Sequence, residues 1–362
     1  MKVAILYGGK SGEHEVSLRS AASIVRNLDP AHRVTLIGIT REGEWRLQPD
    51  SALAACRESD GPLALRRDGP EVLVVPARGL RVFGSHGFSD LAVDAVFPVL
   101  HGTFGEDGTV QGLLECAGLP YVGADVLGSA VGMDKEAAKA LWRDAGLPVL
   151  PHVVIRSAEP GAVAAARAAV EGSFGWPAFV KPARAGSSVG ASSVKSAADF
   201  ERAAQEALRF DTKALVEPFT PAREIECSVI GNASPRAFEP GEIAPTHEFY
   251  DYEAKYLDPD GAAILIPAPV DQAVRDRVRE LAVRAYSAAM LEGLARVDFF
   301  LDKRDGALWL NEVNTLPGFT SISMFPMMCA AGGLPYPRLL DELLSLAVSR
   351  KASRDGLSYA HG

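Results

Sequence analysis

The chain has 362 residues, of which 48% are hydrophobic and 23% are charged. This length predicts two or three globular domains, and the composition excludes an intrinsically disordered protein. The formal net charge of −9 argues against a nucleic-acid-binding protein, which usually carries a basic face. In so acidic a chain, individual lysines and arginines become candidates for contacts with anionic substrates.

Cysteine spacing and hydropathy indicate the cellular compartment. The four cysteines are widely scattered and form no C-x-x-C pair, which favours reduced, buried thiols over a metal cluster or disulfides. The apolar stretch 3–7 is too short for a signal peptide, and no window reaches the roughly 18 uncharged apolar residues of a membrane span. We therefore expect a cytoplasmic protein without a membrane partner.

The first third of the chain alternates apolar runs with helical patterns. A short apolar run at 2–7 ends in glycines, and a helical stripe of apolar residues follows at 18–28. Further apolar runs cover 33–40, 71–76 and 93–100. Strands that alternate with helices predict a doubly wound, parallel α/β domain over roughly the first 120 residues.

The rest of the chain follows two other patterns. A helix is predicted at 134–145, with Asp134 as its N-cap. Short strands and two helices between about 150 and 216 then predict a small α+β lobe. The remainder contains an alternating strand at 223–230, a polar aromatic segment around 246–261, a long amphipathic helix, two strands and terminal helices. We expect three lobes in series, with ligand sites between them.

The glycine-rich sequence Gly8-Gly9-Lys10-Ser11 follows the first predicted strand. It is not a P-loop, because Ala4 stands where that motif needs its first glycine. It is a poor dinucleotide fingerprint, because the spacing is G-G-x-x-G and the second strand ends in Ile39-Thr40 without an acid. The glycines alone fit a tight turn as well as a ligand site. The adjacent Glu13-His14-Glu15 favours a ligand site, because open α/β sheets bind ligands at the carboxyl ends of their strands.

Two neighbouring predicted strands in the last quarter of the chain carry acids among apolar residues. Alternate residues share a face, so Arg296 lies with Asp298, and Glu312 lies with Asn314. A hairpin turn at Asp305-Gly306 would place Asp298 opposite Glu312, where like charges destabilise the pair unless they are neutralised. Oxygen ligands of this kind suit magnesium, which also takes oxygens from substrate phosphates. We predict a magnesium site here rather than two solvated acids.

A second candidate site follows the apolar strand predicted at 177–181. Lys181 closes this strand, and the glycine- and serine-rich loop 183–190 comes next. An ammonium beside exposed backbone N–H groups can hold nucleotide phosphates, whereas an ordinary turn would not explain the lysine. Glu217 and Glu224 could accept hydrogen bonds from an adenine amine and from ribose hydroxyls, although solvated surface acids fit their positions as well.

The segment His101-Gly-Thr-Phe-Gly-Glu-Asp-Gly108 follows the apolar run 93–100. A lone histidine is usually structural, and Glu-Asp-Gly commonly marks a turn or the start of a helix. The segment nevertheless lies at the carboxyl end of a predicted strand, where functional groups gather in α/β folds. The structural and the functional interpretation both remain open on these residues alone.

Taken together, the motifs resemble the D-alanine–D-alanine ligase family over essentially the whole chain. The matching segments, in order, are 8–17, 101–112, 133–135, 181–182, 186–190, 249–256, 296–298 and 311–321. The resemblance implies an N-terminal doubly wound parallel α/β lobe followed by a two-lobed ATP-grasp fold. It places the N-terminal domain at 1–123, the small central lobe at 124–216 and the C-terminal lobe at 217–362.

The resemblance implies an ATP-dependent reaction for peptidoglycan precursor synthesis. ATP would phosphorylate the carboxylate of one D-alanine, and the amine of a second would attack the acyl phosphate. The tetrahedral intermediate would then lose phosphate and leave D-alanyl-D-alanine. The implied cofactors are ATP and two magnesium ions, which manganese can replace. The implied assembly is a homodimer without nucleic acid.

Carried over by motif, the resemblance assigns residue roles. The implied catalytic residues are Glu13, Ser187, Tyr256, Arg296, Gly318 and Ser323. The implied ATP-binding residues are Lys135, Lys181, Glu217, Phe219, Glu224 and Lys255. The implied D-alanine contacts are Glu13, His101, Lys255, Arg296, Ser323 and Met324. The implied magnesium ligands are Asp298, Glu312 and Asn314, in agreement with the argument from the strand pair.

Two positions depart from the family pattern. Gly12 stands where alanine is common, and Pro218 stands where members often have a residue with an amide N–H. Because proline cannot donate, an adenine contact here must come from its carbonyl group or from Phe219. The nearest alternative is a D-alanine–D-lactate ligase, which the loop near Tyr256 would distinguish, and other ATP-grasp carboxylate–amine ligases come next. A non-catalytic ATP-binding regulator would have lost a metal ligand or Arg296, and neither is lost.

Overall fold

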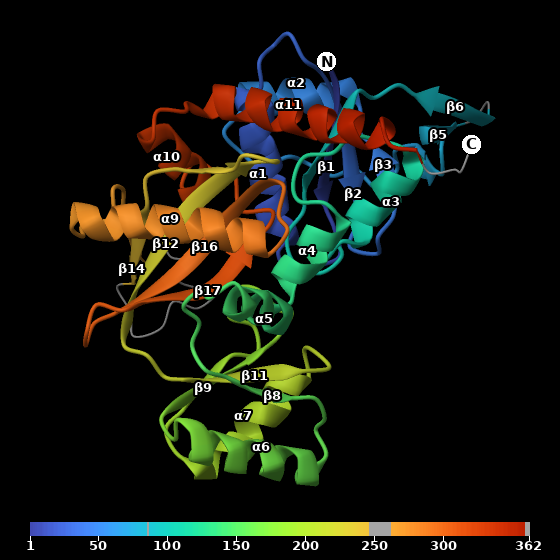
Figure 1. Cartoon of the computed structure of the whole chain (residues 1–362). Coiled ribbons are helices and arrows are strands. Elements are labelled where there is room, and N and C mark those ends of the chain that lie inside the picture. The colour runs from blue at the N-terminus through green and yellow to red at the C-terminus, as the bar shows by residue number, and fades with distance from the viewer. Residues whose placement is uncertain (85–86, 246–261, 359–362) are drawn as a thin grey trace.

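The computed structural model describes residues 1–84, 87–245 and 262–358. Three separate sheets of seven, four and six strands organise these residues. Figure 1 shows the four-stranded lobe set apart from the two larger sheets, with α5 (Lys135–Asp144) lying between it and the rest of the molecule. No helix of the described segments is long and apolar enough to cross a membrane.

The N-terminal sheet has the strand order β6-β5-β4-β3-β2-β1-β7. Its strands are β1 (Lys2–Gly8), β2 (Arg33–Ile39), β3 (Trp45–Leu47), β4 (Glu71–Val75), β5 (Gly79–Gly84), β6 (Gly87–Leu91) and β7 (Ala95–Val99). The predicted parallel arrangement is present where β1 pairs with β2 and β7. The remaining neighbours pair antiparallel, so the run predicted at 71–76 is a strand that extends the sheet in a mixed arrangement.

Helices cover both faces of this sheet, as a doubly wound fold requires. Alternate residues of β1 enter different cores: Val3 and Ile5 join one, and Ala4 and Leu6 join the other. The first core is completed by α1 (His14–Asn27), α2 (Asp50–Glu58) and the distant α11 (Tyr336–Asp355). The second core is covered by α3 (Thr109–Ala117).

Two short helices lead out of the N-terminal domain, α4 (Val126–Met133) and α5. The predicted N-cap is confirmed, because the Asp134 side chain accepts hydrogen bonds from the backbone N–H groups of Glu136 and Ala137. Trp142 of α5 is fully buried, and its Nε1 donates to Ala285 O at 3.0 Å. This helix is therefore anchored in the core of the C-terminal sheet.

The small lobe is an antiparallel sheet in the order β10-β9-β11-β8. Its strands are β8 (Val153–Ile155), β9 (Ala178–Pro182), β10 (Ser192–Val194) and β11 (Ala214–Pro218). The predicted helices are α6 (Pro160–Ser173) and α7 (Ala197–Leu208), which share one apolar core with the sheet. Because β11 runs to Pro218, Glu217 belongs to this sheet.

The C-terminal sheet is antiparallel, with the order β15-β14-β12-β16-β17 and with β13 paired to β12. Its strands are β12 (Ala222–Gly231), β13 (Arg236–Ala237), β14 (Gly241–Pro245), β15 (Ala262–Leu265), β16 (Gly293–Asp302) and β17 (Leu308–Asn314). The long amphipathic helix is α9 (Gln272–Ala288), which packs on this sheet, and α10 (Met324–Ala331) precedes α11. The predicted strand pair is therefore present as β16 and β17.

Candidate active site

The two carboxylates predicted for magnesium lie opposite each other on β16 and β17. The register pairs Asp298 with Glu312, and it pairs Arg296 with Asn314. This pairing depends on a β-bulge, because the register shifts between Asp298 and Phe299, and Phe299 pairs with Leu310. Asn311 is therefore the extra residue on β17, and the bulge brings the two acids face to face.

The residues around this acid pair suit a hard cation. The Oδ1 atom of Asn314 is buried and has no hydrogen-bond partner among the residues that the structure describes, as an unused metal ligand would be. Within the described ranges, no three His, Cys, Asp or Glu side chains could hold a metal ion together. A cation here would therefore combine Asp298, Glu312 and Asn314 with oxygens from a bound molecule. Magnesium commonly combines one or two carboxylates with substrate phosphates in this way.

Arg296 is clamped between two acids of the same sheet. Its guanidinium donates to Asp298 Oδ1 and Oδ2 at 2.7 Å each, and its Nε lies 3.0 Å from Glu226 Oε2. Burial opposes the cation, but the neighbouring carboxylates of Asp298 and Glu226 outweigh burial and raise the pKa of Arg296 further. Arg296, one of the implied catalytic residues, is thus held charged in a fixed orientation.

Glu226 was not predicted, although the sequence contained a signal for it. In β12, Glu224, Glu226 and Ser228 are alternate residues and share one face. Glu226 pairs with Asp298 across the strands, so a row of acids runs from β12 through β16 to β17. The alternation of polar residues along β12 therefore indicates Glu226 as a further residue of the site.

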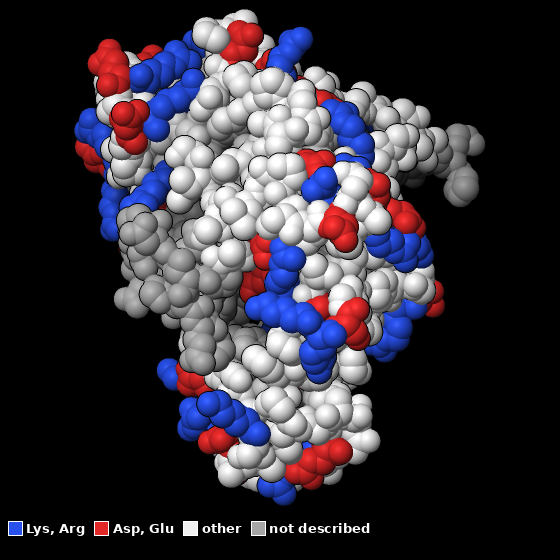
Figure 2. Space-filling view, turned by 90° about the vertical axis from the view of Figure 1, so that its left-hand side faces the viewer, with Lys and Arg blue, Asp and Glu red and all other residues white. Residues whose placement is uncertain are grey.

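Two lysines predicted for phosphate binding connect different parts of the site. Lys135 Nζ lies 3.1 Å from Glu312 Oε2 and donates to Ala185 O at 2.9 Å. Lys181 Nζ lies 2.7 Å from Glu217 Oε2 and donates to the bulge residue Asn311 at 3.0 Å. Figure 2 shows basic and acidic side chains gathered beside a hollow where the small lobe meets the rest of the molecule.

Glu217 has a second lysine partner that the sequence analysis missed. Lys139 of α5 is fully buried, and its Nζ lies 2.7 Å from Glu217 Oε1. Burial alone would raise the pKa of Glu217, but Lys139 and Lys181 outweigh it and hold that pKa well below its usual range. The available signal was the spacing, because residues four apart on a helix lie on one face and Lys135 begins α5.

The opening loop and the glycine- and serine-rich loop meet at two residues for which the resemblance implies catalytic roles. Ser187 Oγ donates to Glu13 Oε1 at 2.7 Å across 174 residues of sequence. The Glu13 carboxylate also packs closely against the backbone of Gly102, since a Cβ added at Gly102 would lie 2.9 Å from Glu13 Oε2. Tyr256, which the resemblance implies as a member of this hydrogen-bonded group, lies outside the described residues, as does Lys255.

His101 is buried and links the N-terminal domain to the last loop of the site. Its Nδ1 lies 3.0 Å from Leu316 O, and its Nε2 lies 3.4 Å from Ser20 Oγ. Burial opposes the imidazolium, but the Glu106 carboxylate outweighs it and raises the pKa of His101. These contacts give His101 a structural role, and its predicted contact with substrate stays a prediction.

Gly318 and Ser323 lie together at the start of α10. The Thr320 N–H donates to Ser323 Oγ at 2.9 Å, and a Cβ added at Gly318 would lie 2.8 Å from that oxygen. Met324 is buried in a small apolar cluster with Ile243 and Met328. A contact from Met324 to D-alanine would therefore come from its backbone.

Phe219 and Glu224 remain candidates for nucleotide binding, with one restriction. The Phe219 N–H donates to Pro177 O at 3.0 Å, so this amide is already used. The Phe219 ring is 38% exposed, which leaves the ring or the Pro218 carbonyl to contact an adenine. Glu224 lies on β12, between Ile243 and Phe300 in the strand register.

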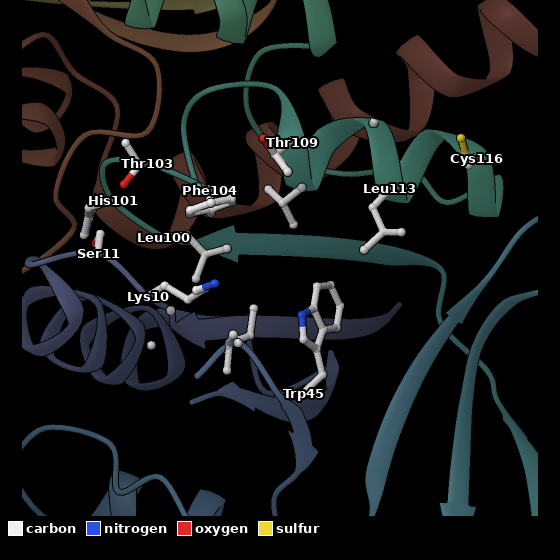
Figure 3. A pocket seen from close by; sticks show the side chains of 17 residues that line it. Lys10, Ser11, Trp45, Leu100, His101, Thr103, Phe104, Thr109, Leu113 and Cys116 are labelled. Atoms are coloured by element: carbon white, nitrogen blue, oxygen red, sulfur yellow. The ribbon is translucent and has the colours of Figure 1, made fainter. Parts of the chain in front are cut away.

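A cavity of about 400 Å³ lies beside the opening loop, at the carboxyl ends of β1, β2 and β7. Figure 3 shows Lys10, Trp45, Phe104 and Leu113 around it, and Lys10 Nζ lies 4.9 Å from the centre of the Phe104 ring. Of the predicted site residues that the structure describes, His101 alone lines this cavity. The described residues predicted for nucleotide and metal therefore lie elsewhere, between the small lobe and the C-terminal sheet.

Comparisons with known proteins agree with this arrangement. Family models described as D-ala D-ala ligase N-terminus and C-terminus match residues 2–124 and 141–345. A D-alanine–D-alanine ligase of Treponema denticola is 50% identical over 97% of this chain and 96% of its own length. One of a Bradyrhizobium species is 51% identical, with the same shares covered.

Solved structures are similar over nearly the whole chain. The D-alanine–D-alanine ligase from Coxiella burnetii is 35% identical, with a TM-score of 0.81 over 98% of this chain and 97% of that chain. The VanG D-Ala:D-Ser ligase from Enterococcus faecalis is 36% identical, with a TM-score of 0.83 over 96% of this chain and 99% of that chain. The likeness thus covers all three sheets.

Proposed function

The chain belongs to the D-alanine–D-alanine ligase family, and we propose that it uses ATP to join two D-alanines into D-alanyl-D-alanine. The observation that carries the proposal is that three sets of contacts bring together loops and strands that are distant in sequence. Glu13 contacts Ser187, Lys181 contacts Glu217 and Asn311, and Arg296 contacts Glu226. This arrangement supports binding of a small zwitterion beside a nucleotide.

In the first step, a carboxylate oxygen of one D-alanine attacks the γ-phosphorus of ATP. The new O–P bond forms as the bond to the β-phosphate oxygen breaks, which yields D-alanyl phosphate and ADP. Glu13, held by Ser187, would bind the ammonium group of this D-alanine. Lys135, Lys181 and Lys255 would hold the phosphates, while Glu217, Phe219 and Glu224 would hold the adenine and the ribose.

In the second step, the unprotonated amine of another D-alanine attacks the acyl carbon. The tetrahedral intermediate expels phosphate, and the attacking nitrogen loses a proton. Arg296 and the Gly318 backbone N–H would stabilise the developing oxyanion. Lys255 and Ser323 would hold the carboxylate of the second D-alanine, with His101 and Met324 lining the substrate site. Tyr256 would help to close the site over the acyl phosphate.

Asp298, Glu312 and Asn314 would bind two magnesium ions, for which manganese can substitute. When bound there, magnesium would neutralise phosphate charge and orient the γ-phosphate. The buried Asn314 Oδ1, which has no hydrogen-bond partner within the described part of the chain, supports this assignment. We further propose a cytoplasmic homodimer that works in peptidoglycan precursor synthesis, in line with the expectation from the family resemblance.

The acceptor is the open choice within this family. A similar structure is that of a D-Ala:D-Ser ligase, and D-lactate is the acceptor considered from the sequence. The test is phosphate release and product formation from ATP, magnesium and D-alanine, with D-serine, D-lactate, L-alanine or no second substrate added. D-Alanyl-D-alanine should form only with D-alanine and magnesium together. Equal ATP turnover without any amino acid would refute the ligase assignment.

A further inference from the structure

Lys139 is a buried cation that the proposed mechanism does not use. We propose that Lys139 is a positioning residue for adenine recognition, and that it serves as the permanent counter-ion of Glu217 while Lys181 turns to the ATP phosphates. This inference rests on the proposed function, in which Glu217 contacts the adenine amine and Lys181 contacts phosphate.

The argument begins with two cations on one carboxylate. Lys139 Nζ and Lys181 Nζ lie 2.7 Å from Glu217 Oε1 and Oε2 respectively. Glu217 is only 2% exposed, so its charge is isolated from water. A buried carboxylate that loses its partner carries a large desolvation cost. Glu217 therefore needs one cation in every state of the enzyme.

The two lysines differ in their freedom to leave. The Lys181 side chain is 10% exposed and also donates to Asn311, which adjoins the proposed metal ligand Glu312. The Lys139 side chain is fully buried, and its Nζ donates to the Leu310 carbonyl oxygen at 3.2 Å. The partly exposed Lys181 can turn toward a phosphate, whereas the fully buried Lys139 stays with Glu217.

The helix that carries Lys139 is fixed. Ala138 and Trp142 of α5 are buried in the core of the C-terminal sheet, while Glu217 belongs to the small lobe. Figure 1 shows α5 between these two parts of the molecule. Lys139 therefore holds a carboxylate of one lobe from a rigid support on the other.

The arrangement leaves an acceptor for adenine. Glu217 Oε1 stays with Lys139 at 2.7 Å, whereas Oε2 loses its cation when Lys181 turns to a phosphate and can then accept from adenine. An ionised carboxylate accepts from the amino group of adenine and repels the carbonyl oxygen that guanine presents at the same place. Keeping Glu217 ionised thus favours ATP over GTP.

The test is Lys139→Met, which keeps the apolar stem and removes the charge. Steady-state rates with ATP and with GTP, at saturating D-alanine and magnesium, should show a KM for ATP raised about tenfold and a kcat changed about twofold or less. The preference for ATP over GTP should fall by a similar factor. A purely structural lysine would not change nucleotide selectivity.

The matched control is Lys213→Met. Lys213 pairs with Asp134 and Glu136 at the start of the same helix, at 2.6 and 2.7 Å. This variant removes two other ion pairs between the start of α5 and the small lobe, neither of which involves Glu217. It should lower the melting temperature without changing the KM for ATP or the preference over GTP.

A double-mutant cycle separates action through Glu217 from a general loss of structure. Glu217→Gln should weaken the preference for ATP, because the amide can donate to the guanine oxygen. Lys139→Met should then add little in the Glu217→Gln background, and this neutral pair should remain folded. Additive effects on the KM for ATP would overturn the inference.

Failure of the inference differs from failure of the proposed function. A wild type that makes dipeptide, with a Lys139→Met variant that keeps its KM for ATP and its selectivity, would refute the role of Lys139 alone. If the wild type makes no dipeptide, calorimetric titration with ATP and GTP still tests the inference. Weaker and less selective ATP binding in Lys139→Met would then support it, and unchanged binding would overturn it.

Discussion

Asp298 faces Glu312 across β16 and β17 because Asn311 is inserted as a bulge between the paired segments. On the turn side of the bulge, Phe299 pairs with Leu310, and continuation of that register would have placed Asp298 opposite Asn311. The bulge therefore creates the acid pair. The bulge residue Asn311 also accepts a hydrogen bond from Lys181, so one irregularity positions both a proposed metal ligand and a proposed phosphate-binding lysine.

Replacement of Glu312 tests the acid pair. Glu312→Gln should lower turnover by more than about 100-fold and raise the magnesium concentration needed for half-maximal rate, because one charge of the metal site is lost. Stability should change little, since relief of the repulsion with Asp298 offsets the lost ion pair with Lys135. The measurement is a magnesium titration of dipeptide formation together with thermal unfolding.

Asp305→Asn is the matched control, since this acid lies in the turn of the same strand pair and accepts from the Ala307 N–H. It should keep the wild-type magnesium dependence. Near-normal turnover of Glu312→Gln at low magnesium would show that the acid pair does not bind the metal.

The hydrogen bond between Ser187 and Glu13 should matter for the first D-alanine. Ser187→Ala removes the hydroxyl that fixes the carboxylate, so kcat/KM for D-alanine should fall about tenfold. Ser196→Ala, which removes an exposed hydroxyl from the same lobe, should have no effect. Initial rates at varied D-alanine measure both, and equal rates in the two variants would contradict the predicted contact.

The start of the glycine- and serine-rich loop is fixed by an ion pair whose strength depends on pH. Asp211 accepts from the Arg184 backbone N–H at 2.8 Å and from its guanidinium. Burial opposes the carboxylate, but the hydrogen bonds from Arg184 outweigh burial and lower the pKa of Asp211. Its stabilising effect is therefore complete above the unfolded-state pKa of about 4 and is lost as the pH falls through the lower native value.

Asp211→Asn should consequently lower the free energy of unfolding by roughly 1–2 kcal/mol at pH 7. The difference from wild type should shrink as the pH falls below about 4. Urea unfolding at pH 7, 5, 4 and 3 measures it, with the exposed Glu171→Gln on α6 as the control. A difference that stays constant down to pH 3 would exclude the ionised pair as its source.

Tyr256→Phe tests acceptor selection at a position outside the described residues. The resemblance implies that this tyrosine favours an amine acceptor, since family members that use D-lactate lack it. The variant should still make dipeptide but gain D-lactate ligation, most visibly at lower pH, where less unprotonated amine competes. Product ratios from mixed D-alanine and D-lactate across pH measure this gain. If the ratios match the wild type throughout, selectivity lies elsewhere.

The sequence predicted the main strands, including the pair β16 and β17, and the facing acids, but not how the acid pair arises. Counting residues on either side of Asp305 paired Asp298 with Glu312 correctly. The count assumed a regular hairpin. In the structure, the register next to the turn pairs Phe299 with Leu310, and only the bulge at Asn311 restores the pairing of Asp298 with Glu312. A bulge depends on packing across several strands, and periodicity along one strand does not report that packing.

Contacts between residues that are far apart in the chain could not be predicted from the sequence either. Lys139 and Glu217 are 78 positions apart, and Lys181 and Asn311 are 130 apart. Each pair forms because separate lobes meet, which local spacing cannot reveal. The antiparallel extension of the N-terminal sheet was missed for a related reason. An apolar run such as β4 is compatible with either strand direction, and the connections decide between them.

The packing of α11 on the first sheet has a consequence for how the chain reaches its native state during synthesis. Leu339, Leu340, Leu343 and Leu344 share one core with Val3 and Ile5, and Arg350 donates to the carbonyl oxygens of Tyr121 and Gly123. α1 and α2 cover part of this core, but the part that α11 covers stays exposed until α11 has been synthesised. We therefore expect an isolated fragment of residues 1–123 to expose apolar surface of this core and to aggregate more readily than the whole chain.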